Sequence, residues 1–79
     1  MAIHYIKITI LELFSQAADG FVVHELVPKL NRPYKAIEKR LKAYYLQSLL
    51  SRQKEGNKYR YAITTKGKMR LNYLKKASN

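Results

Sequence analysis

The fold is decided by residues 33–67, PYKAIEKRLKAYYLQSLLSRQKEGNKYRYAITTKG, where one periodic pattern is followed by another. Over about residues 33–49 the apolar side chains recur at spacings of three and four, which predicts an amphipathic helix. Pro33 suits the first position of this helix, because its fixed φ is already helical and its missing N–H is not needed there. The side expected to be buried carries Ile37, Leu41, Tyr44, Tyr45 and Ser48, and the opposite side carries Lys35, Lys39 and Lys42.

From about residue 50 to residue 64 the pattern has a period of two, which is typical of β-strands. Gly56-Asn57 in the middle of this segment is a signal for a two-residue hairpin turn. Folding the segment at this turn predicts three cross-strand pairs on one face: Lys54 with Tyr59, Arg52 with Tyr61, and Leu50 with Ile63. The aliphatic stems of Arg52 and Lys54 are then expected to cover the tyrosine rings.

The segment before residue 33 predicts three further elements. An amphipathic helix is expected over about residues 2–18 and ends at Asp19-Gly20, because glycine readily takes the left-handed conformation after a helix. Residues 21–23 predict a short strand, and residues 24–30 predict a helix that Pro28 keeps short or bends near Val27. The apolar stripe of the first helix contains Ile3, Ile6, Ile10, Leu13 and Ala17, widened by Leu11 and Phe14.

A final helix is predicted over about residues 66–77. Its apolar residues are Met69, Leu71, Tyr73 and Leu74. A chain of 79 residues is expected to form one hydrophobic core, and therefore a single domain over residues 1–79. The predicted fold class is α+β and mainly α, with a three-helix core, a β-hairpin and a C-terminal helix.

Positive charge is concentrated in one part of the chain, whose net charge is +11. Residues 1–28 contain one basic and three acidic side chains, a net charge of −2, so residues 29–79 have a net charge of +13. A surface charged for solubility would spread these residues, whereas a concentrated basic stretch is typical of proteins that bind polyanions. DNA, RNA and an anionic membrane are candidate partners, and a solvated lysine-rich surface is the alternative.

The residue types argue against several kinds of chemistry. The chain has no cysteine, which excludes disulfides and thiolate zinc sites. His4 and His24 lack the spacing of a metal-binding pair, and five scattered acidic residues leave little material for acid–base catalysis. No apolar run approaches the ~20 residues of a membrane span, and the basic residues do not form one long amphipathic helix. We therefore expect no enzyme activity, no metal, no small-molecule cofactor and no membrane partner.

Two runs of the chain together resemble the winged helix-turn-helix superfamily, in the style of the small MarR-, ArsR- and PadR-like regulators and their archaeal and viral relatives. These runs are Ile37-x3-Leu41-x2-Tyr44-x3-Ser48-Leu49-Leu50-x-Arg52 and Tyr61-x-Ile63-Thr64-x-Lys66-Gly67-x3-Leu71. The chain departs from the family pattern at Tyr44, where leucine is typical, and at Ser48, where glycine is usual. The resemblance covers nearly the whole chain. It implies a recognition helix over about residues 33–49 and a wing over about residues 50–64.

The resemblance also implies which residues contact DNA. Arg32 and Lys42 would contact phosphates beside a major groove whose bases face Tyr34, Lys35, Glu38 and Lys39. The wing would place Lys54, Asn57, Lys58 and Arg60 along phosphates or in a minor groove. Glu38 has two interpretations, because at a base edge it would accept a hydrogen bond from cytosine, whereas on a solvated helix it would pair with Lys42.

We therefore expect a protein that binds double-stranded DNA sequence-specifically as a transcriptional regulator. Its compartment would be the cytoplasm, at the nucleoid, or the host cytoplasm if the source is viral. An architectural, weakly specific DNA-binding protein is one alternative, and a winged helix that contacts RNA or protein is another. A homodimer is expected through the last helix and the stripe from Ile3 to Phe14, although a monomer would need the same residues for its core.

Overall fold

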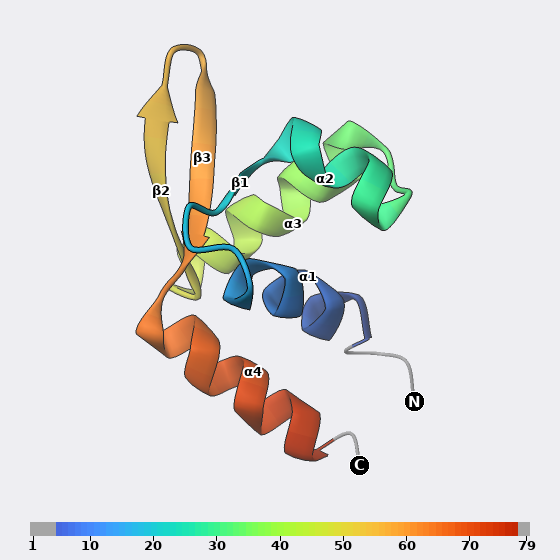
Figure 1. The fold of residues 1–79 in the computed structure, drawn as a ribbon, viewed down its shortest axis with the longest axis vertical. Helices are drawn as coiled ribbons and strands as arrows, with labels where there is room; N and C mark the ends of the chain where they lie inside the picture. The colour runs from blue at the N-terminus through green and yellow to red at the C-terminus, as the bar shows by residue number, and fades with distance from the viewer. Residues whose placement is uncertain (1–4, 78–79) are drawn as a thin grey trace.

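Four helices and three short strands make up residues 5–77, the part of the chain that the computed structural model describes (Figure 1). Their order along the chain is the order expected from the sequence, and the mainly helical α+β class is confirmed. Ile3 and His4 lie outside the described residues. The elements are α1 (Tyr5–Ser15), β1 (Phe21–Val22), α2 (Val23–Leu30), α3 (Tyr34–Leu46), β2 (Leu50–Glu55), β3 (Lys58–Ile63) and α4 (Thr65–Ala77).

The three strands form one antiparallel sheet in the order β1-β3-β2. The β2–β3 hairpin has the predicted register: Leu50 pairs with Ile63, Arg52 with Tyr61, and Lys54 with Tyr59. Gly56 makes its two-residue turn possible, because its φ of +64° lies in the left-handed region that glycine adopts without steric cost. β1 pairs with the other edge of β3, so the central strand of the sheet also belongs to the hairpin.

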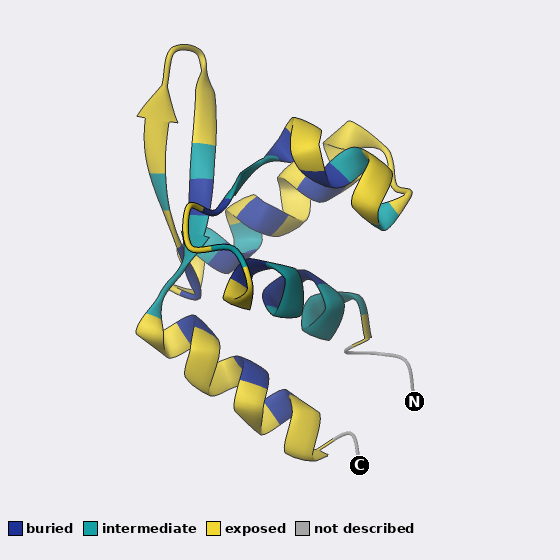
Figure 2. Cartoon of the chain, viewed as in Figure 1, coloured by how far each residue is buried: buried dark blue, intermediate teal, exposed yellow. Residues whose placement is uncertain are grey.

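The hydrophobic core lies around α1, which has α4 on one side and α2, α3 and the sheet on the other (Figure 2). Ile10, Leu11 and Phe14 are completely buried. Phe14 meets Phe21 of β1 edge to face, with ring centroids 5.2 Å apart. The apolar stripe predicted for the first helix is therefore used within the monomer. The other elements bury Val23, Leu26, Ile37, Leu41, Tyr44, Leu49, Leu50, Tyr61, Leu71 and Leu74.

The apolar face of α4 is narrower than its sequence predicts. Leu71 and Leu74 are buried, but Met69 and Tyr73 are 67% and 62% exposed. Met69 and Tyr73 are four residues apart, so they share the face of the helix that points away from the core. Gly67 is buried in the first turn, where a Cβ atom would overlap the carbonyl oxygen of Leu49. α4 therefore approaches the chain at Leu49 closely enough that only glycine fits.

Three boundaries of α1 and α3 differ from the predictions. α1 ends at Ser15 instead of residue 18, because the N–H groups of Gln16 and Ala17 donate to carbonyl groups three residues earlier and tighten the chain. α3 begins at Tyr34, and Pro33 is the extended residue before it, with ψ of 148°, not its first helical residue. α3 also ends at residue 46 instead of 49.

α2 has the short length predicted from Pro28. It contains this proline, which breaks the i to i−4 hydrogen bonding because it has no N–H, and the helix ends two residues later at Leu30. Asn31 then takes a left-handed φ of 53° and donates its N–H to the carbonyl oxygen of Val27. The helix starts at Val23, which the sequence analysis assigned to the preceding strand.

Ser48 forms the turn that ends α3 three residues before the predicted boundary. Its φ is +65°, in the left-handed region. The N–H groups of Ser48 and Leu49 donate to the carbonyl groups of Tyr45 and Tyr44, which is the Schellman pattern of helix ends. The Thr64 hydroxyl donates to the carbonyl groups of Ser48 and Leu49, at 2.7 and 3.0 Å, and ties this turn to the start of α4.

Replacing Ser48 with glycine is expected to stabilise the protein, since glycine adopts a positive φ without the steric cost of a β-carbon. The free energy of unfolding of Ser48→Gly should rise by about 0.5–1 kcal/mol, as measured by urea denaturation. Ser51→Gly is the matched control, because residue 51 lies within β2, where glycine should lower this free energy. A less stable Ser48→Gly variant would contradict this account of the turn.

Candidate nucleic-acid interface

The hairpin projects past the helices (Figure 1). A groove lies between the hairpin and α3. This α3–hairpin groove has a volume of about 690 Å³, with one wall from α3 and the other from β2 and β3. Four of its lining residues are basic and one is acidic. The lining consists of Lys35, Glu38, Lys39, Lys42, Arg52, Tyr59 and Tyr61.

The helical wall follows from the spacing of residues along α3. Ile37 and Leu41 face the core, so the lysines predicted for the opposite side are exposed. The structure thus brings together Lys35, Glu38, Lys39 and Lys42, four of the residues predicted to contact DNA. Arg32 is not a lining residue of this groove. It lines a separate small cavity of about 60 Å³ beside Ile10 and Ile37.

A second hollow of about 150 Å³ lies nearer the hairpin turn. Tyr34 at the start of α3 lines it together with Asn57 and Lys58 of the hairpin. Glu38 and Tyr59 line both hollows, which are therefore neighbours. Lys54 pairs with Tyr59 across the hairpin but does not line either hollow. The residues predicted from the helix and from the hairpin tip are thus largely on one surface.

Arg52 is a groove residue whose role the sequence analysis did not identify. Its guanidinium carbon lies 4.1 Å from the ring centroid of Tyr45 on α3 and 4.1 Å from that of Tyr59 on β3. The neighbouring Tyr61 hydroxyl, with smaller effects of Tyr59 and Tyr45, raises the pKa of Arg52, and an arginine is charged under all ordinary conditions. The hairpin pattern predicted that its stem covers tyrosines, but Tyr45 is brought in by tertiary packing.

Arg60 makes ion pairs, unlike the other hairpin cations predicted to contact DNA. Its Nε is 2.9 Å from Glu55 Oε2, and a terminal nitrogen is 3.6 Å from Glu25 Oε1 at the start of α2. Glu25 also accepts the N–H of Val22 at 3.0 Å. Glu55 is the first cause of the raised pKa of Arg60. Arg60 therefore connects the hairpin to α2, on the face turned away from Arg52.

The basic groove residues have no carboxylate partner among residues 5–77. Three of the five acidic residues form ion pairs there, and the pair outside the hairpin joins Lys75 of α4 to Glu12 of α1 at 3.2 Å. Glu38 has no basic nitrogen of residues 5–77 within 4.0 Å, so the pairing with Lys42, one of its two interpretations, is not present. The ion-paired carboxylates thus hold elements together, whereas the lysines of the groove have no carboxylate partner among these residues.

A separate polar cluster joins α1 to the end of α3. Lys7 Nζ donates to Gln47 Oε1 at 3.0 Å and lies 5.3 Å from the ring centroid of Tyr44. Partial burial, and to a lesser extent Arg70, lower the pKa of Lys7. Burial also raises the pKa of Tyr44, against a smaller effect of Arg40. Lys7 therefore serves contacts within the fold and is not part of the groove.

Comparison with known proteins leaves the function to be argued from this geometry, since no family model matches the chain and no curated protein is significantly similar to it. Within residues 5–77 there is no group of three or more histidine, aspartate or glutamate side chains that could hold a metal ion. None of the described helices combines the length and apolar character needed to cross a membrane.

Arg60 and Lys58 are expected to behave differently although they lie on the same face of β3. Arg60→Gln should lower the urea midpoint of unfolding, because it removes the ion pair that joins the hairpin to α2 and the ion pair between the two strands of the hairpin. Lys58→Gln should leave the midpoint nearly unchanged. The difference should shrink in high salt, which screens exposed pairs. Equal midpoints for the two variants at low salt would show that Arg60 does not hold the hairpin.

Proposed function

We propose that this chain is a winged helix-turn-helix protein that binds double-stranded DNA sequence-specifically and acts as a transcriptional regulator. In this proposal α3 is the recognition helix in the major groove, and the hairpin is the wing on the backbone or in the minor groove. The observation that carries the proposal is the α3–hairpin groove, since unpaired cations from a helix and a hairpin line one surface. Such a surface suits the phosphates that border a DNA groove.

The dimensions of α3 fit this role. Its 13 residues give a length of about 20 Å at ~1.5 Å per residue, and the major groove of B-DNA admits a helix. Glu38 gives the exposed face a means of reading sequence, because a carboxylate repels phosphates but accepts a hydrogen bond from the cytosine amino group. Its lack of an ion pair within residues 5–77 leaves it available for that contact.

Homodimerisation remains part of the proposal, with a narrower surface than the sequence suggested. Ile10, Leu11 and Phe14 are in the monomer core, so the exposed pair Met69 and Tyr73 on α4 is left as the apolar contact. A dimer would bind a pseudo-palindromic site with half-sites about one helical turn apart. We place such a protein in the cytoplasm, on the DNA.

An architectural, weakly specific DNA-binding protein is the second candidate. The observation that favours it is the distribution of charge, since α4 adds five basic residues and no acidic residue outside the groove. Charge spread over several elements binds phosphates of any sequence. The two candidates differ in salt dependence and in sequence preference, because each phosphate contact adds about −0.9 to the slope of log K against log salt.

The proposal is tested by selecting bound sequences from random duplex DNA at about 0.15 M salt, where surface charges act over roughly 8 Å. A recovered pseudo-palindrome supports a dimeric regulator, and an enriched site without symmetry supports a monomeric one. Retention without enrichment favours the architectural candidate. If no duplex is retained, DNA binding is rejected, and RNA or a protein becomes the partner to test.

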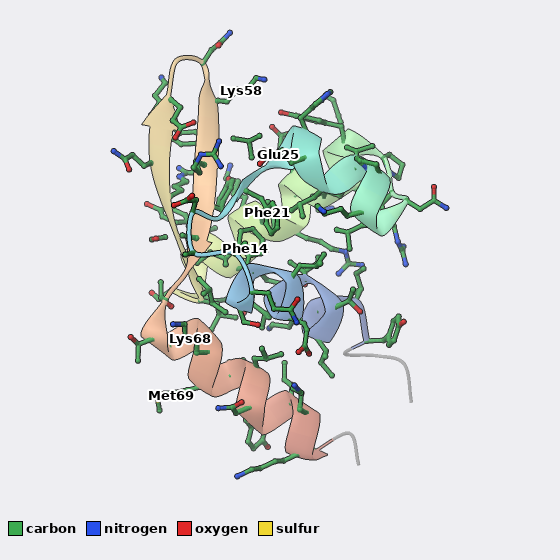
Figure 3. The ribbon with its side chains drawn as sticks, viewed as in Figure 1. Phe14, Phe21, Glu25, Lys58, Lys68 and Met69 are labelled. Atoms are coloured by element: carbon green, nitrogen blue, oxygen red, sulfur yellow. The ribbon has the colours of Figure 1, made fainter. Side chains whose placement is uncertain are left out.

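Lys39→Ala is expected to weaken binding of the selected site by more than ~1 kcal/mol if Lys39 contacts a base. Binding of an unrelated duplex should change much less. Lys68→Ala is the matched control, since Lys68 is an exposed lysine on α4, away from the groove (Figure 3). Equilibrium titration with fluorescent duplexes measures both effects. An equal loss on both sequences would reassign Lys39 to a phosphate.

A further inference from the structure

We propose that Arg52 is a fixed phosphate ligand between the walls of the α3–hairpin groove, where it binds the sugar–phosphate strand that separates the major and minor grooves of a bound duplex. This inference rests on the proposed function and adds to it a residue that the resemblance did not assign. It also places the sugar–phosphate strand between the two DNA grooves in the α3–hairpin groove.

The path of the strand follows from the shape of DNA. Adjacent major and minor grooves are divided by one sugar–phosphate strand. If α3 occupies the major groove and the hairpin reaches the minor groove beside it, that strand must pass between α3 and the hairpin. The space between them is the α3–hairpin groove, and Arg52 is one of its lining residues.

The orientation of Arg52 is fixed by aromatic rings from both walls. Tyr45 and Tyr59 each lie 4.1 Å from the guanidinium carbon, so two rings occupy its surroundings before any ligand arrives. A guanidinium group presents its N–H donors in a planar fork that matches two oxygens of a phosphate. Because the rings already restrict this fork, less side-chain freedom is lost on binding than for a lysine of the groove.

The charge of Arg52 is available to a ligand. No carboxylate among residues 5–77 lies within 4.0 Å of it, in contrast to Arg60 on the opposite face of the hairpin. Its side chain is half-buried, so it is held by the protein and still reaches the groove. Arg52 touches α3 through Tyr45 and β3 through Tyr59, so a phosphate bound there would fix the DNA relative to both walls.

The test compares the wild type with Arg52→Lys, which keeps the positive charge but loses the planar fork. Both proteins are titrated with the selected duplex and with copies that carry one neutral methylphosphonate at successive backbone positions. At one position per half-site, neutralisation should lower wild-type affinity about tenfold and Arg52→Lys affinity less than about twofold. Equal sensitivity of the two proteins at every position would overturn the proposal.

Two further variants separate binding from folding. Lys39→Ala should keep the wild-type sensitivity at that phosphate, because the cation stacked on Tyr45 and Tyr59 is Arg52 and not Lys39. Tyr59→Leu keeps Arg52 but removes one of its two rings, so it should reduce the loss of affinity caused by neutralising that phosphate. This variant replaces Arg52→Lys as the test if circular dichroism shows that Arg52→Lys does not fold. Unchanged sensitivity in a folded Tyr59→Leu variant would contradict the orienting role of the ring.

The proposed function and the role of Arg52 fail in different ways. If the wild type binds no duplex, the proposed function is rejected and the role of Arg52 with it. If the wild type binds random duplex without sequence preference, Arg52→Gln should make the salt slope shallower by about 0.9. An unchanged slope would reject the phosphate contact of Arg52 and leave DNA binding itself intact.

Discussion

The burial of Ile10, Leu11 and Phe14 is the constraint on which the rest of the structure depends. Each such side chain contributes roughly 1.5–3 kcal/mol when it is removed from water, a large share of the stability of a small domain. If other elements covered only one side of α1, these three side chains would not all be buried. α1 therefore requires α4 on one side and the sheet and the other helices on the other, and this arrangement leaves the outer face of α3 beside the free hairpin.

Opposite charges have separate uses in this molecule. Carboxylates are few, and the ion pairs they form join α1 to α4, the hairpin to α2, and the two strands of the hairpin to each other. The lysines of α3 repel one another in the free protein, which lowers its stability, and a polyanion would remove that repulsion. Tyr45 and Tyr59 hold one guanidinium among these exposed ammonium groups. The surface therefore combines adaptable charge with one oriented donor.

Local patterns predicted the elements better than their contacts. The register of the hairpin followed from its two-residue turn, because alternation and turn geometry leave no second solution. The end of α3 was placed too late, since Leu49 and Leu50 continue the apolar pattern and serine replaces the glycine that marks such a turn. The Arg60–Glu25 pair joins segments distant in sequence, and Tyr45 reaches Arg52 only because α3 packs against the hairpin, so no local pattern reports either contact.

The close backbone contacts at Gly20 and Gly67 restrict which residues can change in related sequences. A Cβ atom at Gly20 would overlap the carbonyl oxygen of Tyr61, and one at Gly67 would overlap that of Leu49. Exposed lysines and arginines exchange freely without disturbing a core, so the surface of the α3–hairpin groove is free to diverge between lineages. Gly20 and Gly67 do not have this freedom, because any larger residue would collide with backbone. Distant relatives with a different groove surface should thus be recognisable by two glycines that hold the scaffold, even where the basic residues no longer align.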